Sequence, residues 1–297
     1  MSGHAIARPA PSAVLELLKP VTWFPPVWAF LCGVVSAGVP LSDKIGEIAL
    51  GLLLAGPLVC AASQAMNDWA DRHVDAINEP NRPIPSGRIP GQWGLIIAWA
   101  WTFLSVIVGA MLGPVVLAAT LMGITFAWAY SFEPMRMKAD GWWGNLTCGV
   151  CYEGLAWITG AAVMLGGNSP HWHIFALAGL YSLGAHGIMT LNDFKSIEGD
   201  KRMGVRSLPV QLGPERAARV ACWFMALPQV VVIVLLARWG APWHALAVAG
   251  LLGAQLLAMP RLLRDPRGQA PWYNAVGVLL SVIGMMVAAF AVRGMPA

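Results

Sequence analysis

The sequence predicts an all-α membrane protein that forms one polytopic domain over residues 1–297. Hydrophobic residues make up 57% of the chain and charged residues only 11%, and there are 15 tryptophans. No ordinary soluble domain has this composition. The second observation is a series of nine apolar segments of about 20 residues, the length that spans the hydrocarbon core of a bilayer. The excess of four positive charges therefore reports on orientation in the lipid bilayer, and we expect no nucleic-acid partner.

The nine apolar segments follow one another with short connections. They are Val21–Val39, Ile48–Met66, Trp93–Leu112, Val115–Phe132, Trp143–Leu165, Trp172–Leu191, Ala217–Ala237, Trp243–Leu263 and Trp272–Val292. Five of them begin at a tryptophan, a residue that favours the membrane interface. Residues 1–20 form a cytoplasmic N-terminal segment that has no continuous apolar run, so we expect no cleavable signal peptide.

The positive charges lie on alternate connections. Sixteen of the 19 Lys and Arg residues are in the N-terminal segment or in the loops after the second, fourth, sixth and eighth apolar segments. The opposite face has only Lys44, Arg238 and Arg293. By the positive-inside rule, the N-terminus and these four loops are cytoplasmic, and the C-terminus is periplasmic.

A cluster of acidic residues directly follows the second apolar segment. Asn67 is followed by Asp68, Asp71 and Asp75, so a helix continuing through them would place the three carboxylates on one face. Like charges repel, so the arrangement indicates a bound cation, and oxygen ligands without cysteine favour Mg²⁺ or Ca²⁺. Arg82 lies just beyond, and a guanidinium binds phosphate oxygens in bidentate fashion. The alternative is a solvated loop whose charges keep the helix from sliding into the lipid.

A second cluster repeats the pattern after the sixth apolar segment. It begins with Asn192 and Asp193 and continues to Asp200 and Arg206. The two cluster-opening asparagines are 125 positions apart, and Arg82 and Arg206 are 124 apart. Repeats in membrane proteins commonly place a site at their interface. Two acidic clusters on one membrane face would hold a metal-bound diphosphate from both sides, while an apolar channel between helices accepts a lipid tail. A prenyl diphosphate has both parts.

These motifs resemble the UbiA superfamily of intramembrane prenyltransferases. The matching stretches are Asn67–Asp75, Arg82–Gly87 and Asn192–Asp200, and the resemblance extends over nearly the whole chain. Within the superfamily, three stretches look like the chlorophyll synthase branch, and more narrowly like the bacteriochlorophyll synthases of photosynthetic bacteria: Tyr130–Pro134, Tyr152–Trp157 and Asn192–Asp200. The resemblance implies a UbiA-type bundle with two pseudo-repeated Asp-rich cytoplasmic loops, in the bacterial inner (intracytoplasmic) membrane.

The resemblance also implies a reaction. The propionate of bacteriochlorophyllide a would be esterified with a geranylgeranyl or phytyl group from its diphosphate, with release of diphosphate and with Mg²⁺ as cofactor. The pigment carboxylate is ionised at neutral pH, so its attack on C1 of an allylic cation requires no strong base. Other enzymes of pigment biosynthesis and photosystem assembly proteins are candidate protein partners.

We expect the carboxylates of both clusters to hold Mg²⁺ on the diphosphate. The residues assigned to catalysis are Asn67, Asp68, Asp71, Asp75, Asp193 and Asp200. The residues assigned to the metal are Asp68, Asp71, Asp75, Asp193, Glu198 and Asp200. The residues assigned to the diphosphate are Arg82, Lys138, Lys195, Lys201 and Arg206. Many members of the superfamily have an aspartate at the position of Ser196. The question of which carboxylates of the second cluster reach the metal therefore stays open.

Three further residues are candidates for contact with the acceptor or the carbocation. Glu153 lies near the middle of the fifth apolar segment, where a carboxylate costs roughly 2.5–3.5 kcal/mol. It either positions the acceptor or is protonated and bonded to a neighbouring helix. His186 either ligates the magnesium of the chlorin or forms an interhelical hydrogen bond. Tyr130 either stabilises the carbocation or belongs to the interfacial aromatic belt.

Two other functions fit parts of the pattern. A UbiA-type prenyltransferase acting on a quinone precursor or haem would have the same clusters with another acceptor. A secondary transporter also has repeats and intramembrane carboxylates, although here only Glu153 lies near the membrane midplane. The pair Cys148 and Cys151 is not matched by a second pair, so we interpret the five cysteines as small buried hydrophobes.

Overall fold

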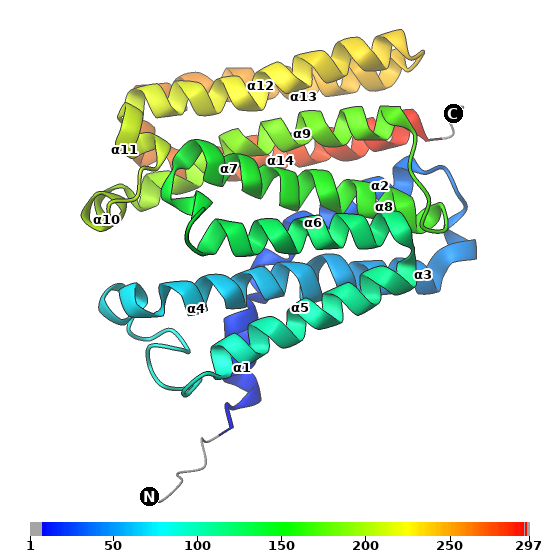
Figure 1. The fold of residues 1–297 in the computed structure, drawn as a ribbon. Helices are drawn as coiled ribbons and strands as arrows, with labels where there is room; N and C mark the ends of the chain where they lie inside the picture. Colours follow the sequence, from blue (N-terminus) through cyan, green and yellow to red (C-terminus); the bar gives the residue numbers. More distant parts are fainter. Residues whose placement is uncertain (1–7, 294, 296–297) are drawn as a thin grey trace, which may run out of the picture.

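The computed structural model describes residues 8–293 and residue 295 of the chain. Within these residues the protein is a bundle of long helices that run back and forth, with no β-strand (Figure 1). The α-helices are α1 (Pro11–Leu18), α2 (Phe24–Ser36), α3 (Ile45–Leu53), α4 (Ala61–Asn78), α5 (Trp93–Leu112), α6 (Pro114–Ser131), α7 (Gly141–Gly149), α8 (Ala156–Met164), α9 (Trp172–Asn192), α10 (Ile197–Met203), α11 (Leu208–Leu212), α12 (Pro214–Arg238), α13 (Pro242–Arg264) and α14 (Pro266–Val292). The predicted all-α fold class is confirmed.

Shorter helical segments join some of these elements. Two π-helical segments, Leu54–Cys60 and Val150–Leu155, connect α3 to α4 and α7 to α8. Four short 3₁₀ helices cover Pro20–Thr22, Leu41–Lys44, Met137–Ala139 and Asp193–Lys195.

Eight helical stretches in the described residues are long and apolar enough to cross a membrane, and a ninth is formed if one bent pair counts as a span. The bent pair is Pro11–Thr22 with Phe24–Ser36, and its two parts meet at 55°. About nine spans were predicted. The first was predicted as Val21–Val39, whereas the helix in that stretch, α2, covers only Phe24–Ser36. Prolines explain the bend: Pro20 and Pro25 stand in the first turns of successive helices, where the missing N–H does no harm, whereas they would break one continuous helix.

The second stretch is longer than predicted. Helix runs without a break from Leu41 to Asn78, whereas the predicted span ends at Met66. No glycine or proline occurs between Met66 and Asn78, so the helix continues through the acidic cluster until Pro80 stops it. Pro57 is accommodated by the π-helical segment, and its carbonyl accepts a hydrogen bond of 2.9 Å from the Trp101 indole.

The connections gather at the two ends of the bundle as the charge pattern predicts. The loops after α4 and α6, the short helices α10 and α11 and the turn from α13 to α14 lie at one end (Figure 1). The connections after α2, α5, α8 and α12 and the end of α14 lie at the other. The Lys- and Arg-rich loops therefore share one end of the molecule, and both acidic clusters are found there.

Glycines allow α2 and α8 to cross in backbone contact. A Cβ atom on Gly160 would overlap the carbonyl oxygen of Phe30, and one on Gly33 would overlap the carbonyl oxygen of Trp157. Small residues at helix crossings are common in membrane proteins, because lipid provides no hydrophobic drive to bring helices together. The close crossing lies next to the π-helical segment Val150–Leu155, which leads directly into α8 and also contacts α2.

Candidate active site

Side chains from both acidic clusters line one polar cavity of about 780 Å³ at the loop-rich end of the bundle. Asp71 and Asp75 come from α4, whereas Asp193 and Asp200 come from the segment that follows α9. The two clusters differ locally: the first stays helical, but α9 ends at Asn192 and gives way to a 3₁₀ turn and α10. Residues 125 positions apart in the sequence are thereby brought to the same cavity.

The cavity has more negative than positive side chains. Six acidic and four basic side chains line it, so acidic side chains outnumber basic ones by two. The carboxylates are Asp71, Asp75, Glu79, Asp140, Asp193 and Asp200, and the cations are Arg82, Arg136, Lys138 and Lys195. Such an excess within a confined space favours the binding of further cations.

Each acidic side chain of the two motifs in the cavity has a polar partner. Arg82 Nη1 lies 2.8 Å from Asp75 Oδ2, and Lys138 Nζ lies 2.6 Å from Asp71. In the second cluster, Asn145 Nδ2 donates to Asp193 Oδ2 at 3.2 Å and Ser196 Oγ donates to Asp200 Oδ2 at 2.9 Å. Burial lowers the pKa of Lys138, and Asp71 opposes that effect.

The described residues contain no group of three His, Cys, Asp or Glu side chains close enough to enclose a metal ion.

Other residues expected at the site lie outside this cavity. The Asp68 carboxylate is buried against Lys19, with 2.6 Å between Nζ and Oδ1. Glu198 is 66% exposed and faces Arg267 at 3.6 Å. Lys201 is exposed on α10, and the exposed guanidinium of Arg206 is 3.9 Å from Asp140.

Several polar residues at or beside the site were not assigned to it from the sequence, among them Glu79, which lines the cavity. Asn145 donates hydrogen bonds to Asp193 and Thr190. A polar residue inside an apolar segment often marks a functional site, so Asn145 could have been found in the sequence. Arg136 and Asp140 line the cavity, and Lys19 pairs with Asp68. Lys19 and Arg136 were used only to orient the chain, because nothing in the sequence places Lys19 beside Asp68 or Arg136 at the cavity.

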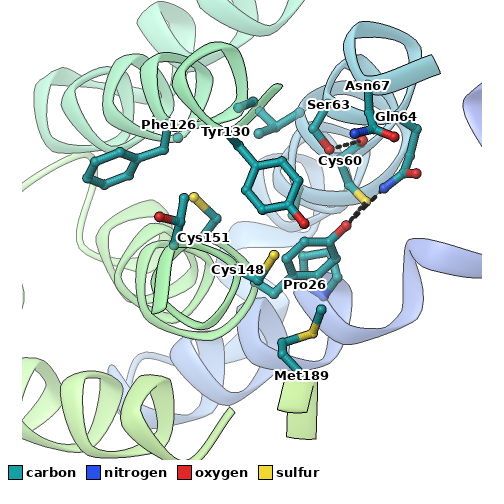
Figure 2. Close-up of a pocket in the computed structure, with 16 residues that line it drawn as sticks. Pro26, Cys60, Ser63, Gln64, Asn67, Phe126, Tyr130, Cys148, Cys151 and Met189 are labelled. Atoms are coloured by element: carbon teal, nitrogen blue, oxygen red, sulfur yellow. Dashed lines mark hydrogen bonds between the residues drawn. The ribbon is translucent and has the colours of Figure 1, made fainter. Parts of the chain in front are cut away.

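An apolar chamber of about 230 Å³ lies deeper in the bundle. Tyr130 lines both this chamber and the polar cavity, so it stands at the join between them. Figure 2 shows its ring directed between Cys148 and the residues of α4. A smaller pocket of about 40 Å³ shares Pro26, Val59 and Gly123 with the chamber and extends it further into the bundle.

Polar groups are few in the chamber, and several are bonded to one another. Gln64 Nε2 donates to the Tyr152 hydroxyl at 3.0 Å, and Cys60 Sγ lies 3.6 Å from the same hydroxyl. Asn67, which opens the first motif, lines the chamber instead of the polar cavity. All five cysteines of the chain are free thiols.

Glu153 and His186 line neither space. Glu153 is buried in the π-helical segment Val150–Leu155, and its Oε2 has no hydrogen-bond partner among the described residues. His186 is buried and stacks on Phe224 of α12, with 4.1 Å between the ring centroids. Both side chains therefore pack within the helix bundle.

Comparison with known proteins places the chain in a family. The model of the UbiA prenyltransferase family matches residues 22–283. The chain is 60% identical to the bacteriochlorophyll synthase 33 kDa chain of Cereibacter sphaeroides, over 99% of this chain and 97% of that protein. It is 46% identical to the bacteriochlorophyll synthase 34 kDa chain of Chloroflexus aurantiacus, over 93% of this chain and 88% of that protein.

Solved structures share the fold at lower identity. A structure from work on digeranylgeranylglyceryl phosphate synthase superposes with a TM-score of 0.75 at 21% identity, covering 94% of this chain and 98% of that one. A UbiA homolog from Archaeoglobus fulgidus, bound to GPP and Mg²⁺, superposes with a TM-score of 0.71 at 20% identity, covering 95% and 99%. The chain belongs to the UbiA prenyltransferase family and is a membrane-embedded prenyltransferase.

Proposed function

We propose that the chain esterifies the propionate of bacteriochlorophyllide a with a geranylgeranyl or phytyl group taken from its diphosphate, and releases diphosphate. The observation that carries the proposal is the join between the polar cavity and the apolar chamber at Tyr130. A prenyl diphosphate has a charged head and an apolar tail, and the two spaces accept both at once. Relatives named bacteriochlorophyll synthase, at 60% and 46% identity, support the choice of acceptor.

The donor set of the cavity fits Mg²⁺. The walls have two more acidic than basic side chains, and the diphosphate adds further negative charge. Asp71, Asp75, Asp193 and Asp200 would supply the protein ligands of one or two Mg²⁺ ions, and the homolog solved with GPP and Mg²⁺ supports this choice of metal. When bound, it would act as a Lewis acid that neutralises charge on the leaving diphosphate.

The cations of the cavity would bind the diphosphate directly. Arg82 and Lys138 are held by aspartates of the first motif, and Lys195 and Arg136 line the cavity beside them. Guanidinium and ammonium groups stabilise the oxygens on which charge develops as the bond to carbon breaks. Lys201 and Arg206 lie on the exposed surface next to the cavity, where they would attract anionic substrate towards its entrance.

The transfer needs one bond broken and one bond formed. The C1–O bond of the prenyl diphosphate breaks, the electron pair leaves with the diphosphate, and a propionate oxygen forms a new bond to C1. No proton moves, because the propionate is already ionised. The Tyr130 ring, at the join of the two spaces, would face the allylic cation with its π-electrons. The apolar chamber would keep out water, whose attack would yield the free prenyl alcohol.

The protein would work as one domain over residues 1–297 in the bacterial inner membrane. Its helices make it a multi-pass membrane protein. The concentration of Lys and Arg at the cavity end supports a cytoplasmic cavity, and hence a periplasmic C-terminus. The water-soluble diphosphate would then enter and leave on the cytoplasmic side.

A competition between acceptors tests the proposal. Membranes containing the chain would be given labelled geranylgeranyl diphosphate, Mg²⁺, bacteriochlorophyllide a, a quinone precursor and haem, and the products would be separated by chromatography. We expect the label in a new hydrophobic pigment, and none after EDTA is added. Label in a prenylated quinone precursor or haem would contradict the proposed acceptor while leaving prenyl transfer in place.

A further inference from the structure

We propose that Asp68 is a positioning residue that does not ligate the metal, and that Lys19, from the N-terminal segment, is its partner. Together they would hold Arg82 in place for the diphosphate. The proposal rests on the proposed prenyl transfer and gives the two residues a role within it.

The contacts of Asp68 separate it from the other aspartates of its motif. Its side chain is only 2% exposed and is absent from the walls of the cavity that Asp71 and Asp75 line. Lys19 Nζ lies 2.6 Å from Asp68 Oδ1, which is the distance of a charge-assisted hydrogen bond. A buried carboxylate needs such a partner, because leaving it unpaired costs several kcal/mol.

Arg82 links this pair to the cavity. Its Nη1 atom lies 3.6 Å from Asp68 Oδ1 and 2.8 Å from Asp75 Oδ2. The guanidinium is therefore held between a carboxylate that lines the cavity and one that does not. Lys19 shares the Asp68 oxygen with Arg82, so its ammonium holds that oxygen at the position from which it attracts the guanidinium.

The backbone conformation of Lys19 supports its role as the partner of Asp68. Lys19 directly follows α1 and has a φ of 47°, a left-handed conformation that few residues other than glycine adopt. Such strain persists where the surrounding contacts determine the conformation. The strained residue is the one whose ammonium meets Asp68.

Helix α1 contacts both α4 and the loop that contains Arg82. Its buried residues Leu17 and Leu18 belong to the same apolar cluster as Ala65 and Met66 of α4. At its exposed side, Glu16 Oε1 accepts a hydrogen bond of 2.8 Å from Arg88, near the end of the loop that contains Arg82. α1 thus contacts α4 through apolar side chains and Lys19, and contacts the loop through Glu16.

The test compares Lys19→Met, Lys19→Arg, Asp68→Asn and the double variant Lys19→Met/Asp68→Leu with Asp71→Asn. Lys44→Met is the matched control, since Lys44 pairs with Glu47 at 2.9 Å at the other end of the bundle. For each variant we would measure the KM for geranylgeranyl diphosphate, the half-saturating Mg²⁺ concentration and thermal stability. Electron paramagnetic resonance of Mn²⁺ with inorganic diphosphate would report metal binding independently of turnover.

We expect Lys19→Met and Asp68→Asn to raise the KM for the prenyl diphosphate about tenfold or more, with metal affinity unchanged. Lys19→Arg should stay close to the parent protein. The double variant removes both charges at once, so it should regain thermal stability while its KM stays raised, because Arg82 keeps only Asp75.

Three outcomes would overturn the proposal. If Asp68→Asn weakened Mn²⁺ binding as much as Asp71→Asn, Asp68 would be a metal ligand. If the double variant regained the parent KM, or if only stability changed in the single variants, the pair would serve folding alone. If Lys19→Met behaved like Lys44→Met, Lys19 would have no role. Absence of pigment ester with the parent protein would instead contradict the proposed function.

Discussion

Single residues of one motif have different surroundings although their spacing is regular. On a helix, Asp68 and Asp75 differ by only about 20° in direction, but they are roughly 10 Å apart along the axis. Asp75 reaches the cavity, whereas Asp68 lies deeper and is covered by Lys19. The sequence predicts that these aspartates share one face of a helix. It does not show which distant segment packs against that face at each position along the helix axis.

The carboxylates that line the cavity should be indispensable. Asp71→Asn and Asp193→Asn should each lower the rate of prenyl transfer by about a hundredfold or more, because each removes charge that would hold Mg²⁺. Glu198→Gln makes the same chemical change on an exposed side chain outside the cavity, so it should keep near-normal activity. Near-normal rates for either aspartate variant, measured in membranes with equal amounts of protein, would refute the assignment of the metal site.

The aromatic ring of Tyr130 should matter more than its hydroxyl. Tyr130→Phe keeps a π-face at the join of cavity and chamber, whereas Tyr130→Leu removes it. We expect Tyr130→Leu to lower kcat and to raise the ratio of free prenyl alcohol to pigment ester, and Tyr130→Phe to change neither strongly. Equal effects of the two substitutions on kcat and on the product ratio would argue against cation stabilisation by the ring.

Secondary structure elements could be predicted where the length of an apolar segment determines the helix. They were harder to predict where local backbone geometry, such as a bend or a π-helical turn, determines it. The long spans from α5 to α9 agree with prediction to within a few residues, because about 20 apolar residues are needed to cross the bilayer. The bend between α1 and α2 and the two π-helical segments were missed. A π-helical turn has no hydrophobic period of its own, and only Pro57 marked one of the two in the sequence.

These two π-helical segments contribute to the chamber, and Gly123 of α6 lies between them. A Cβ atom there would meet Leu155 and Val59 at 3.7 Å, ordinary contact distances, and a longer side chain would occupy chamber space. Gly123→Leu should therefore lower kcat/KM for geranylgeranyl diphosphate by roughly ten- to a hundredfold, while dimethylallyl diphosphate is affected little. Gly179→Leu, on an exposed face of α9, is the control. Equal losses for long and short donors would show that the tail does not lie in this chamber.

At the scale of the whole molecule, the sequence predicted the bundle and the meeting of its two acidic clusters. Alternating positive charge and the repeat of 125 positions were sufficient for this. An apolar channel between helices was expected, but neither the residues that line the chamber nor the contacts of α1 followed from these patterns. Both depend on side chains from segments far apart in the chain, such as Pro26 with Tyr152 and Lys19 with Asp68.

Ligands of the cavity should stabilise the whole bundle. Mg²⁺ and inorganic diphosphate together would bind the folded state only, so at a hundred times their Kd they should add about 2.7 kcal/mol and raise Tm. EDTA should reverse the rise, and Asp193→Asn should prevent it. A rise in Tm that persists in Asp193→Asn would place the binding site outside this cavity. The measurement is a thermal unfolding curve in detergent at constant ionic strength.

The most direct test of the account follows the oxygen atoms of the pigment. Bacteriochlorophyllide a with both propionate oxygens replaced by ¹⁸O would be incubated with geranylgeranyl diphosphate, Mg²⁺ and membranes containing the chain, and the mass of the product would be measured. Attack of the carboxylate on C1 predicts an ester that retains both labelled oxygens and does not form in the presence of EDTA. An ester that retains only one labelled oxygen would show that the carboxylate itself is activated, and would contradict cleavage of the C1–O bond in this cavity.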